Sequence, residues 1–278
     1  MTVRIVTDSA SDLPQELVDK HGIEIVPLTI RFGDDEYVDR KDLSTDQFWT
    51  KLEQSSTLPE TAAPSVGAFE EAFRRLADDG ATGIVCVNLS SRLSATMQSA
   101  QVASKAIEGD CPVAVVDSKK ASMGLGIIAL RAAQRAAEGD DVPTIVAELE
   151  SLRGRVRVMA TLDTLEYLRK GGRIGGAQAM LGSMLSIKPV IDVQDGAVEQ
   201  GGKVRTRSKA LRFLADHVPN VPLEALSILH ANAPDIDDFI AMVQPNHPDT
   251  EIIMGKIGAV IGVHTGPRVV GVSWIEPV

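Results

Sequence analysis

The sequence predicts an α/β protein with two domains, one over residues 1–155 and one over residues 156–278. In the first half, short apolar runs alternate with segments of helical periodicity, which is typical of a mostly parallel, Rossmann-like sheet covered by helices. The second half adds a hairpin signature at Asp195-Gly196, which indicates an α+β domain with a mixed or antiparallel sheet. No Ser-, Pro- or Gly-rich linker separates the halves, so we expect the two domains to pack tightly.

The first domain is expected to contain short apolar strands and helices that begin at capping residues. Pro27 interrupts the apolar run Ile23–Phe32, which predicts one or two strands there. Ser44-Thr45-Asp46-Gln47 is a capping box and predicts a helix to about Ser55. Further strands are expected at Val3–Thr7, Gly83–Val87 and Val113–Val116, and further helices after Pro14, after Pro64-Ser65 and from Ser94 onward, and over Ser122–Glu138 and Val142–Arg153.

The second domain is expected to alternate strands and helices around the hairpin. A short helix ends at Gly171-Gly172, because glycine commonly ends helices. The expected strands are Val156–Leu162, Pro189–Val193, Ala197-Val198, Leu223–His230, Glu251–Met254 and Val269–Ile275. The expected helices are Thr164–Lys170, Gly175–Leu185, Thr206–His217 and Ile236–Val243.

Composition excludes several classes of function. The net charge of −10 argues against binding to nucleic acid or to an anionic membrane surface, since both need a basic face. No apolar run reaches the roughly 20 residues of a membrane span, and the start of the chain does not resemble a secretory signal. Cys86 and Cys111 are expected to be buried free thiols in a reducing cytosol, and no metal-ligand spacing is present. We therefore expect a cytoplasmic protein without a metal.

Four polar clusters follow expected strands or precede expected helices, where α/β proteins build ligand sites: Thr7–Asp12, Thr61–Ser65, Asn88–Thr96 and Asp117-Ser118. The cluster Asn88–Thr96 leads into a helix, whose first N–H groups favour an anion. The hydroxyls of Ser94 and Thr96 would add hydrogen bonds to a carboxylate. The alternative is that Ser91 or Ser94 only caps the helix.

Two further segments leave alternatives open. Gly171-Gly172-Arg173 is either a phosphate cradle with an arginine clamp or a helix end followed by a solvated arginine. His264 is either a hydrogen-bonded structural residue or a ligand-binding one. A phosphotransferase that uses Arg173 lacks the usual phosphate-loop motifs, and a serine hydrolase that uses Ser94 and His264 lacks the G-x-S-x-G elbow.

At these same residues the sequence resembles the DegV family, nearly from end to end. Several segments match the family pattern in order, and together they are highly specific. They are Thr7-Asp8-Ser9-Ala10-Ser11-Asp12-Leu13-Pro14, Thr61-Ala62-Ala63-Pro64-Ser65, Ser90 through Ala100, Asp117-Ser118, Tyr167 through Ile174, Ile187-Lys188-Pro189, Lys203-Val204-Arg205-Thr206 and His264-Thr265-Gly266-Pro267.

The resemblance implies a fatty acid-binding protein with no cofactor and no catalytic machinery of its own. A long-chain fatty acid would lie between the domains, with its carboxylate held by Thr61 and Ser94 and with His264 nearby. The resemblance links Arg173 to the encounter with a separate fatty acid kinase, which makes acyl phosphate for phospholipid metabolism. The expected surroundings of the head group are Ser9, Ala62, Ala95, Thr96 and Thr265.

The sequence departs from the family pattern at three positions. Ala62 replaces a serine, Ala95 replaces a glycine, and Arg268 replaces the last glycine of the H-T-G-P-G turn. Ala95 adds a Cβ beside the expected carboxylate site and restricts backbone conformations with positive φ. Arg268 adds a cation near His264. The hydroxyls of Thr61 and Ser94 are retained.

Overall fold

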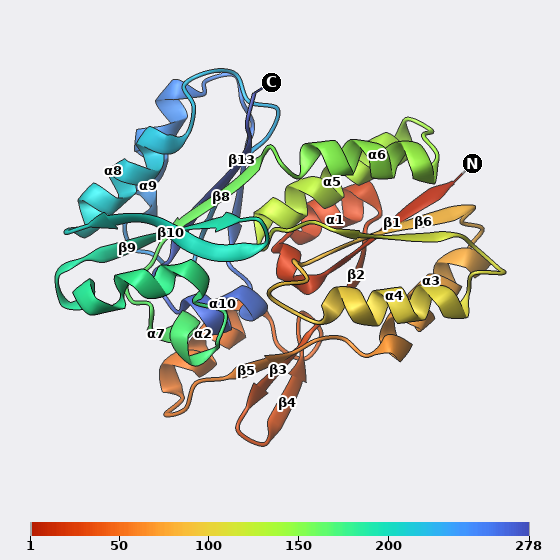
Figure 1. Cartoon of the computed structure of the whole chain (residues 1–278), viewed down its shortest axis with the longest axis horizontal. Coiled ribbons are helices and arrows are strands. Elements are labelled where there is room, and N and C mark those ends of the chain that lie inside the picture. Colours follow the sequence, from red (N-terminus) through yellow and green to blue (C-terminus); the bar gives the residue numbers. More distant parts are fainter. Residues whose placement is uncertain (1, 278) are drawn as a thin grey trace.

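The computed structural model describes residues 2–277, except for the side chains of residues 183–186. Within this range the strands form three sheets, of four, six and three strands. Figure 1 shows the two larger sheets on opposite sides of the molecule, with the smallest sheet at one end of it. This arrangement confirms the predicted α/β fold, with a parallel sheet in the first half and a mixed sheet in the second.

The first sheet is wholly parallel and lies in the N-terminal half of the chain. Its strands, in spatial order, are β2 (Glu24–Val26), β1 (Val3–Asp8), β6 (Gly83–Asn88) and β7 (Val113–Asp117). Because the strands are parallel, β1, β6 and β7 end at the same edge. The polar residues there bond one another: the carboxylate of Asp8 accepts hydrogen bonds from Asn88 and from the backbone N–H of Leu89.

The second sheet is antiparallel except for one parallel pair, β11 with β12. Its strands, in spatial order, are β10 (Ala197–Val204), β9 (Lys188–Gln194), β8 (Val156–Thr161), β13 (Val270–Ile275), β11 (Leu226–His230) and β12 (Ile252–Lys256). The hairpin between β9 and β10 turns at Asp195 and Gly196, as predicted. Both residues have positive φ, 45° and 83°, as a two-residue type I′ turn requires.

The third sheet was only partly predicted. Its strands are β4 (Asp35–Val38), β3 (Thr29–Phe32) and β5 (Glu60–Ala62). Pro27 does separate two strands, β2 and β3, and they belong to different sheets. The strands β4 and β5 had no counterpart in the sequence prediction.

Helices cover both faces of the two larger sheets. The helices of the first half are α1 (Gln15–His21), α2 (Thr45–Gln54), α3 (Val66–Asp78), α4 (Thr96–Ala106), α5 (Met123–Ala137) and α6 (Val142–Leu152), with a 3₁₀ turn η1 at Ser9–Ser11. Those of the second half are α7 (Glu166–Lys170), α8 (Arg207–His217), α9 (Ile236–Val243) and α10 (Ala259–Thr265), with 3₁₀ segments η2 (Gly175–Ser186) and η3 (Gln244–Asn246).

Helix α5 lies between the two larger sheets and packs on both of them (Figure 1). Its residues from Met123 to Leu130 are all buried. A helix that is apolar on every side is expected in such a position, because each face meets protein. One core cluster therefore runs through both halves of the molecule, which agrees with the tight packing expected without a linker.

Two helical segments differ from the prediction. The segment Gly175–Ser186 is helical, as expected, but of the 3₁₀ type. Helix α10 was not predicted, since its residues form a β-branched, glycine-containing run without a capping signal. It packs against α2, where a Cβ on Gly262 would lie 2.5 Å from Cε1 of Phe48. Glycine therefore permits the close approach that tertiary packing imposes on this helix.

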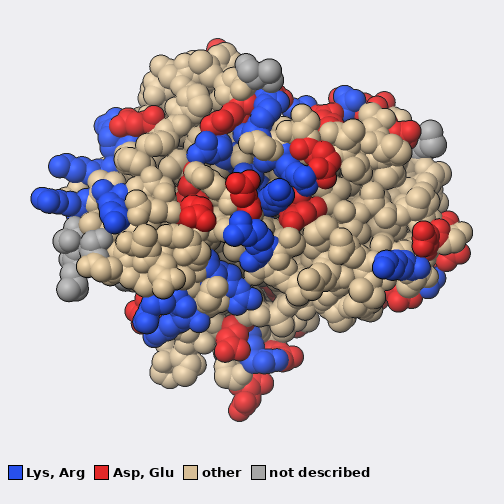
Figure 2. Space-filling view, viewed as in Figure 1, with Lys and Arg blue, Asp and Glu red and all other residues tan. Residues whose placement is uncertain are grey.

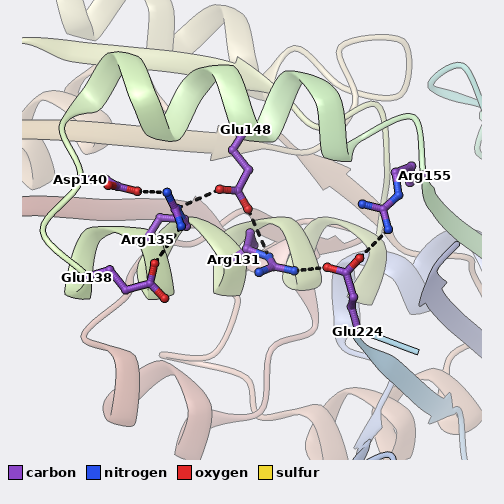
Figure 3. Close-up of polar contacts among 7 residues, drawn as sticks. All are labelled: Arg131, Arg135, Glu138, Asp140, Glu148, Arg155 and Glu224. Carbon is purple, nitrogen blue, oxygen red and sulfur yellow. Dashed lines mark hydrogen bonds and ion pairs between the residues drawn. The ribbon is translucent and has the colours of Figure 1, made fainter. Parts of the chain in front are cut away.

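A network of ion pairs joins α5, α6 and the segments before β8 and β11 (Figure 3). Glu148 on α6 contacts two arginines of α5, Arg131 and Arg135. Glu224, before β11, pairs with Arg131 and with Arg155, which precedes β8. The network is partly exposed and links the N-terminal helices to the second sheet. On the face shown in Figure 2, acidic and basic side chains are interspersed.

Candidate functional site

An apolar cavity lies between the N-terminal half of the chain and the second sheet; we call it the cavity. Three strands contribute alternate residues to its lining, because side chains two apart on a strand point the same way: Val158 and Ala160 in β8, Ile191 and Val193 in β9, and Gly271 and Ser273 in β13. The apolar lining consists of Leu28, Leu89, Leu93, Ala121, Val158, Met159, Ala160, Leu168, Ile191, Val193, Val198, Leu229, Ile257, Val260, Ile261, Val269 and Gly271. The cavity is therefore suited to an apolar group.

Polar side chains also line the cavity, and four of them come from four separate segments. Thr61 lies in β5, Ser94 between β6 and α4, Arg173 after α7, and His264 in α10. The hydroxyl of Thr61 lies 3.0 Å from Nε2 of His264, although the two residues are 203 positions apart in the sequence. Thr265 also lines the cavity, but its hydroxyl donates to the backbone carbonyl of Ile261.

His264 is held in a mostly buried position that favours its neutral form. Burial, together with the smaller effect of the nearby Arg173 guanidinium, lowers the pKa of His264 to about 4. Nδ1 of His264 is buried and has no hydrogen-bond partner among residues 2–277. The ring lies against Gly171, where an added Cβ would be 2.3 Å from Nδ1. The absence of a side chain at residue 171 thus makes room for His264.

Ser94 is oriented by its neighbour Thr96. Their hydroxyls are 2.9 Å apart, and the backbone N–H of Thr96 donates to Oγ of Ser94 at 3.3 Å. Thr96 itself is fully buried and does not line the cavity. The N-cap of α4 is Ala95, and it makes no side-chain capping bond. Ser91 instead donates to the carboxylate of Asp117 at 2.6 Å, so neither serine is a simple cap.

Arg173 is not the solvated surface arginine considered for this position. It is half-buried and lines the cavity beside His264. Its Nε donates to the carbonyl of Leu93 at 3.2 Å, and its Nη1 donates to the carbonyl of Gly171 at 2.7 Å. The glycine pair does end α7. Arg173 follows it and lies close enough to His264 to lower the pKa of that residue.

Ser9, Ala62 and Ala95, which were expected near the head group, do not line the cavity. Ser9 is buried elsewhere, and its hydroxyl accepts a hydrogen bond from the backbone N–H of Leu28 at 3.1 Å. Ala62 and Ala95 are exposed. Ala95 has φ of −77°, so the glycine that usually stands here is not needed for a positive φ.

Arg268 does adopt a positive φ, 62°, where the family pattern has glycine. Its side chain is about half exposed and pairs with Asp163, with 3.3 Å between Nε and Oδ2. Asp163 also pairs with Lys188 at 2.9 Å. The cation added by this departure is therefore directed to a carboxylate on the surface.

Two other features are absent from residues 2–277. No group of three or more His, Cys, Asp or Glu side chains in that range is placed to hold a metal ion. No helix of the described chain is long and apolar enough to span a membrane. Cys86 and Cys111 are buried and free, as predicted.

Comparison with known proteins gives consistent matches over the whole chain. The model of the family described as "Uncharacterised protein, DegV family" matches residues 2–277. A DegV domain-containing protein of Streptomyces coelicolor is 39% identical over 276 residues, which cover 97% of each chain. A DegV domain-containing protein of Deinococcus radiodurans is 38% identical over 282 residues, which cover 100% of this chain and 99% of the relative.

Solved structures match equally completely. A DegV family protein from Thermus thermophilus, described as binding fatty acid, has a TM-score of 0.89 and 33% identity, with all of both chains covered. DegV from Bacillus subtilis, described as a fatty acid binding protein, has a TM-score of 0.91 and 28% identity over the full length of both chains. The match of sequence and fold over the whole length shows that this chain belongs to the DegV family.

Proposed function

We propose that the protein binds a long-chain fatty acid in the cavity, with the carboxylate at Thr61, Ser94 and His264. One observation supports this proposal best. A single cavity is lined mostly by apolar side chains and also by polar side chains from four separate segments, two of which, Thr61 and His264, are in contact. Relatives that share the whole fold are described as fatty acid binding proteins. We further propose that residues 1–155 and 156–278 form two domains and that the ligand lies between them.

The expected energetics favour an apolar chain over a small polar ligand. Burial of a fatty chain contributes about 0.8 kcal/mol per CH₂ group, so the chain provides most of the affinity. The head group needs satisfied hydrogen bonds more than a strong ion pair. Neutral His264 and the hydroxyls of Thr61 and Ser94 would provide such bonds, while the guanidinium of Arg173 would compensate the negative charge.

The same proposal makes the protein a cytoplasmic carrier that serves a fatty acid kinase and has no catalysis of its own. The kinase would phosphorylate the bound fatty acid for phospholipid metabolism. Arg173 is the proposed contact with that partner or with the phosphoryl group being transferred. Its position at the polar end of the cavity supports this role, because guanidinium groups recognise phosphate well.

The geometry does not favour the serine hydrolase alternative. In a Ser–His–Asp triad, the histidine would bond the serine through one nitrogen and an aspartate through the other. Here Nε2 of His264 contacts Thr61, and Ser94 bonds Thr96. Nδ1 of His264 has no partner in the described part of the chain.

Affinity measurements on hydroxyl variants test the proposed site. Ser94→Ala and Thr61→Val should each weaken palmitate binding by roughly 1.5–3 kcal/mol, the cost of losing a hydrogen bond to a charged group. Isothermal titration calorimetry on delipidated protein would measure the change. Ser56→Ala and Thr57→Val are matched controls at exposed positions and should bind like the parent protein. Unchanged affinity in both site variants would place the carboxylate elsewhere.

A further inference from the structure

Asp12 does not line the cavity, but its carboxyl group bonds two segments that do. Its Oδ1 accepts a hydrogen bond from the backbone N–H of Gly258 at 2.9 Å, and its Oδ2 accepts one from the hydroxyl of Ser122 at 2.5 Å. Ser122 is the N-cap of α5, and Gly258 is the N-cap of α10. Asp12 itself follows the turn η1, so one side chain joins three segments that are far apart in the sequence.

Both of the segments bonded by Asp12 contribute to the wall of the cavity. Ala121 and Ser122 come from the start of α5, and Ile257 and Val260 come from the start of α10. Because the two segments bond the same carboxyl group, they lie next to each other in that wall. Their separation would open the wall at this place.

The backbone of Ser122 indicates that the junction is under strain. Its φ of 52° and ψ of −145° lie close to a region that almost only glycine adopts. Such a conformation persists only where the surrounding bonds impose it. Here the N–H of Ser122 donates to the carbonyl of Ala10 at 2.9 Å, and its hydroxyl donates to Asp12. Loss of the bond to Asp12 would therefore favour movement of this segment.

The environment of Asp12 disfavours its ionised form. The pKa of its carboxyl group is raised to about 7, mainly by burial and to a smaller extent by Asp39, against the opposing effects of its two hydrogen bonds and of Arg40. Asp12 also lines a polar pocket, which we call the outer pocket, whose charged residues are Asp12, Asp39, Arg40, Asp46 and Lys256. Asp46 and Lys256 are exposed there, so water reaches this pocket.

We propose that Asp12 is a positioning residue for ligand binding: its carboxyl group holds the starts of α5 and α10 together and keeps the cavity closed around the bound fatty acid. The inference rests on the proposed fatty acid function and adds to it a residue that does not touch the ligand. Release of the ligand would break the two bonds of Asp12 and expose its carboxyl group to water in the outer pocket.

Release should then be linked to pH, because water favours the ionised carboxylate. With a pKa of about 7 in the closed state and the ordinary 3.8 in the open state, opening releases a proton between these two values. Opening therefore becomes more favourable as pH rises from about 4 to 7 and levels off above 7. From pH 6 to pH 8 the open population, and with it the release rate, should increase about tenfold.

The test follows the release of bound parinaric acid, a fluorescent long-chain fatty acid, into excess albumin by stopped-flow fluorescence. The parent protein should release it about tenfold faster at pH 8 than at pH 6. Asp12→Asn cannot ionise, and its carboxamide can accept from Gly258 and donate to the hydroxyl of Ser122. This variant should release the ligand at one slow rate at both pH values. Asp46→Asn, at an exposed aspartate of the same pocket, is the matched control and should keep the pH dependence of the parent.

Ser122→Ala removes one of the two bonds and keeps the carboxyl group. It should release parinaric acid about two- to tenfold faster than the parent, as expected for one lost hydrogen bond, and should still depend on pH. A parent rate that is the same at pH 6 and pH 8, an Asp12→Asn variant that keeps the tenfold increase, or an unchanged rate in Ser122→Ala would each overturn the proposal. A parent protein that binds neither parinaric acid nor palmitate would instead contradict the proposed function itself.

Discussion

Replacement of Gly171 by alanine should weaken fatty acid binding, although residue 171 is not itself one of the proposed contacts of the carboxylate. The backbone at this residue has φ of −75°, which alanine adopts without strain. The new Cβ, however, would lie 2.3 Å from Nδ1 and 3.0 Å from Cε1 of His264. The imidazole must then move, and its contact with the hydroxyl of Thr61 is lost.

The expected loss equals about one hydrogen bond to a charged group, roughly 1.5–3 kcal/mol, or about a tenfold to hundredfold weaker affinity. Palmitate titration by calorimetry would measure it, and urea unfolding of the lipid-free protein would report stability separately. The unfolding free energy should change little, because the ring of His264 can rotate while the backbone stays in place.

Gly172→Ala provides a matched control one residue further along the chain. No atom lies within 4 Å of a Cβ built there, but φ is +69°. Alanine should therefore cost about 1–2 kcal/mol of stability through its left-handed backbone, with palmitate affinity unchanged. Palmitate affinity equal to that of the parent protein in Gly171→Ala, or an equal loss of affinity in both variants, would contradict a role of Gly171 in positioning His264.

Two further predictions concern stability. Because the pKa of His264 is lowered from 6.5 to about 4, the unfolded chain takes up a proton at a higher pH than the folded protein, so this residue should destabilise the fold as pH falls from about 6.5 to 4. Urea unfolding across this range should show a shallower acid decline for His264→Gln, and parallel curves would contradict the assignment. Glu224→Gln should lower the unfolding free energy by about 0.2–1 kcal/mol in low salt, and the difference should shrink in 1 M NaCl. An equal loss at both salt concentrations would show that packing, and not charge, is responsible.

Most elements of the two larger sheets could be predicted from local patterns. Strands such as β6 (Gly83–Asn88) are short apolar runs that are buried along their whole length. The capping box at Ser44 forms as the sequence indicates, with Ser44 and Gln47 bonded reciprocally. In contrast, β4 (Asp35–Val38) is charged and partly exposed, and β5 (Glu60–Ala62) is only three residues long, so neither has a readable periodicity.

The candidate site could be predicted only in part, because it is assembled by tertiary packing. The resemblance named Thr61, Ser94 and His264, and the fold brings all three to the lining of a single cavity. The resemblance also suggested Ser9, which packs against another part of the backbone. Gly171 and His264 are far apart in the sequence, so their contact could not be predicted from local patterns. The sequence indicated only that the glycine pair Gly171-Gly172 ends a helix or forms a loop.

Quantitative extraction of lipid from the purified protein would show directly whether it carries a fatty acid. The protein would be purified without added lipid, its mass measured under native conditions, and its ligand released by denaturing extraction and identified by mass spectrometry. The proposal predicts one long-chain fatty acid per protein molecule. The ratio of fatty acid to protein should be lower in a double variant that carries Thr61→Val and Ser94→Ala. A purified protein that carries only a nucleotide or a sugar, and that takes up no palmitate when it is supplied, would contradict the proposal.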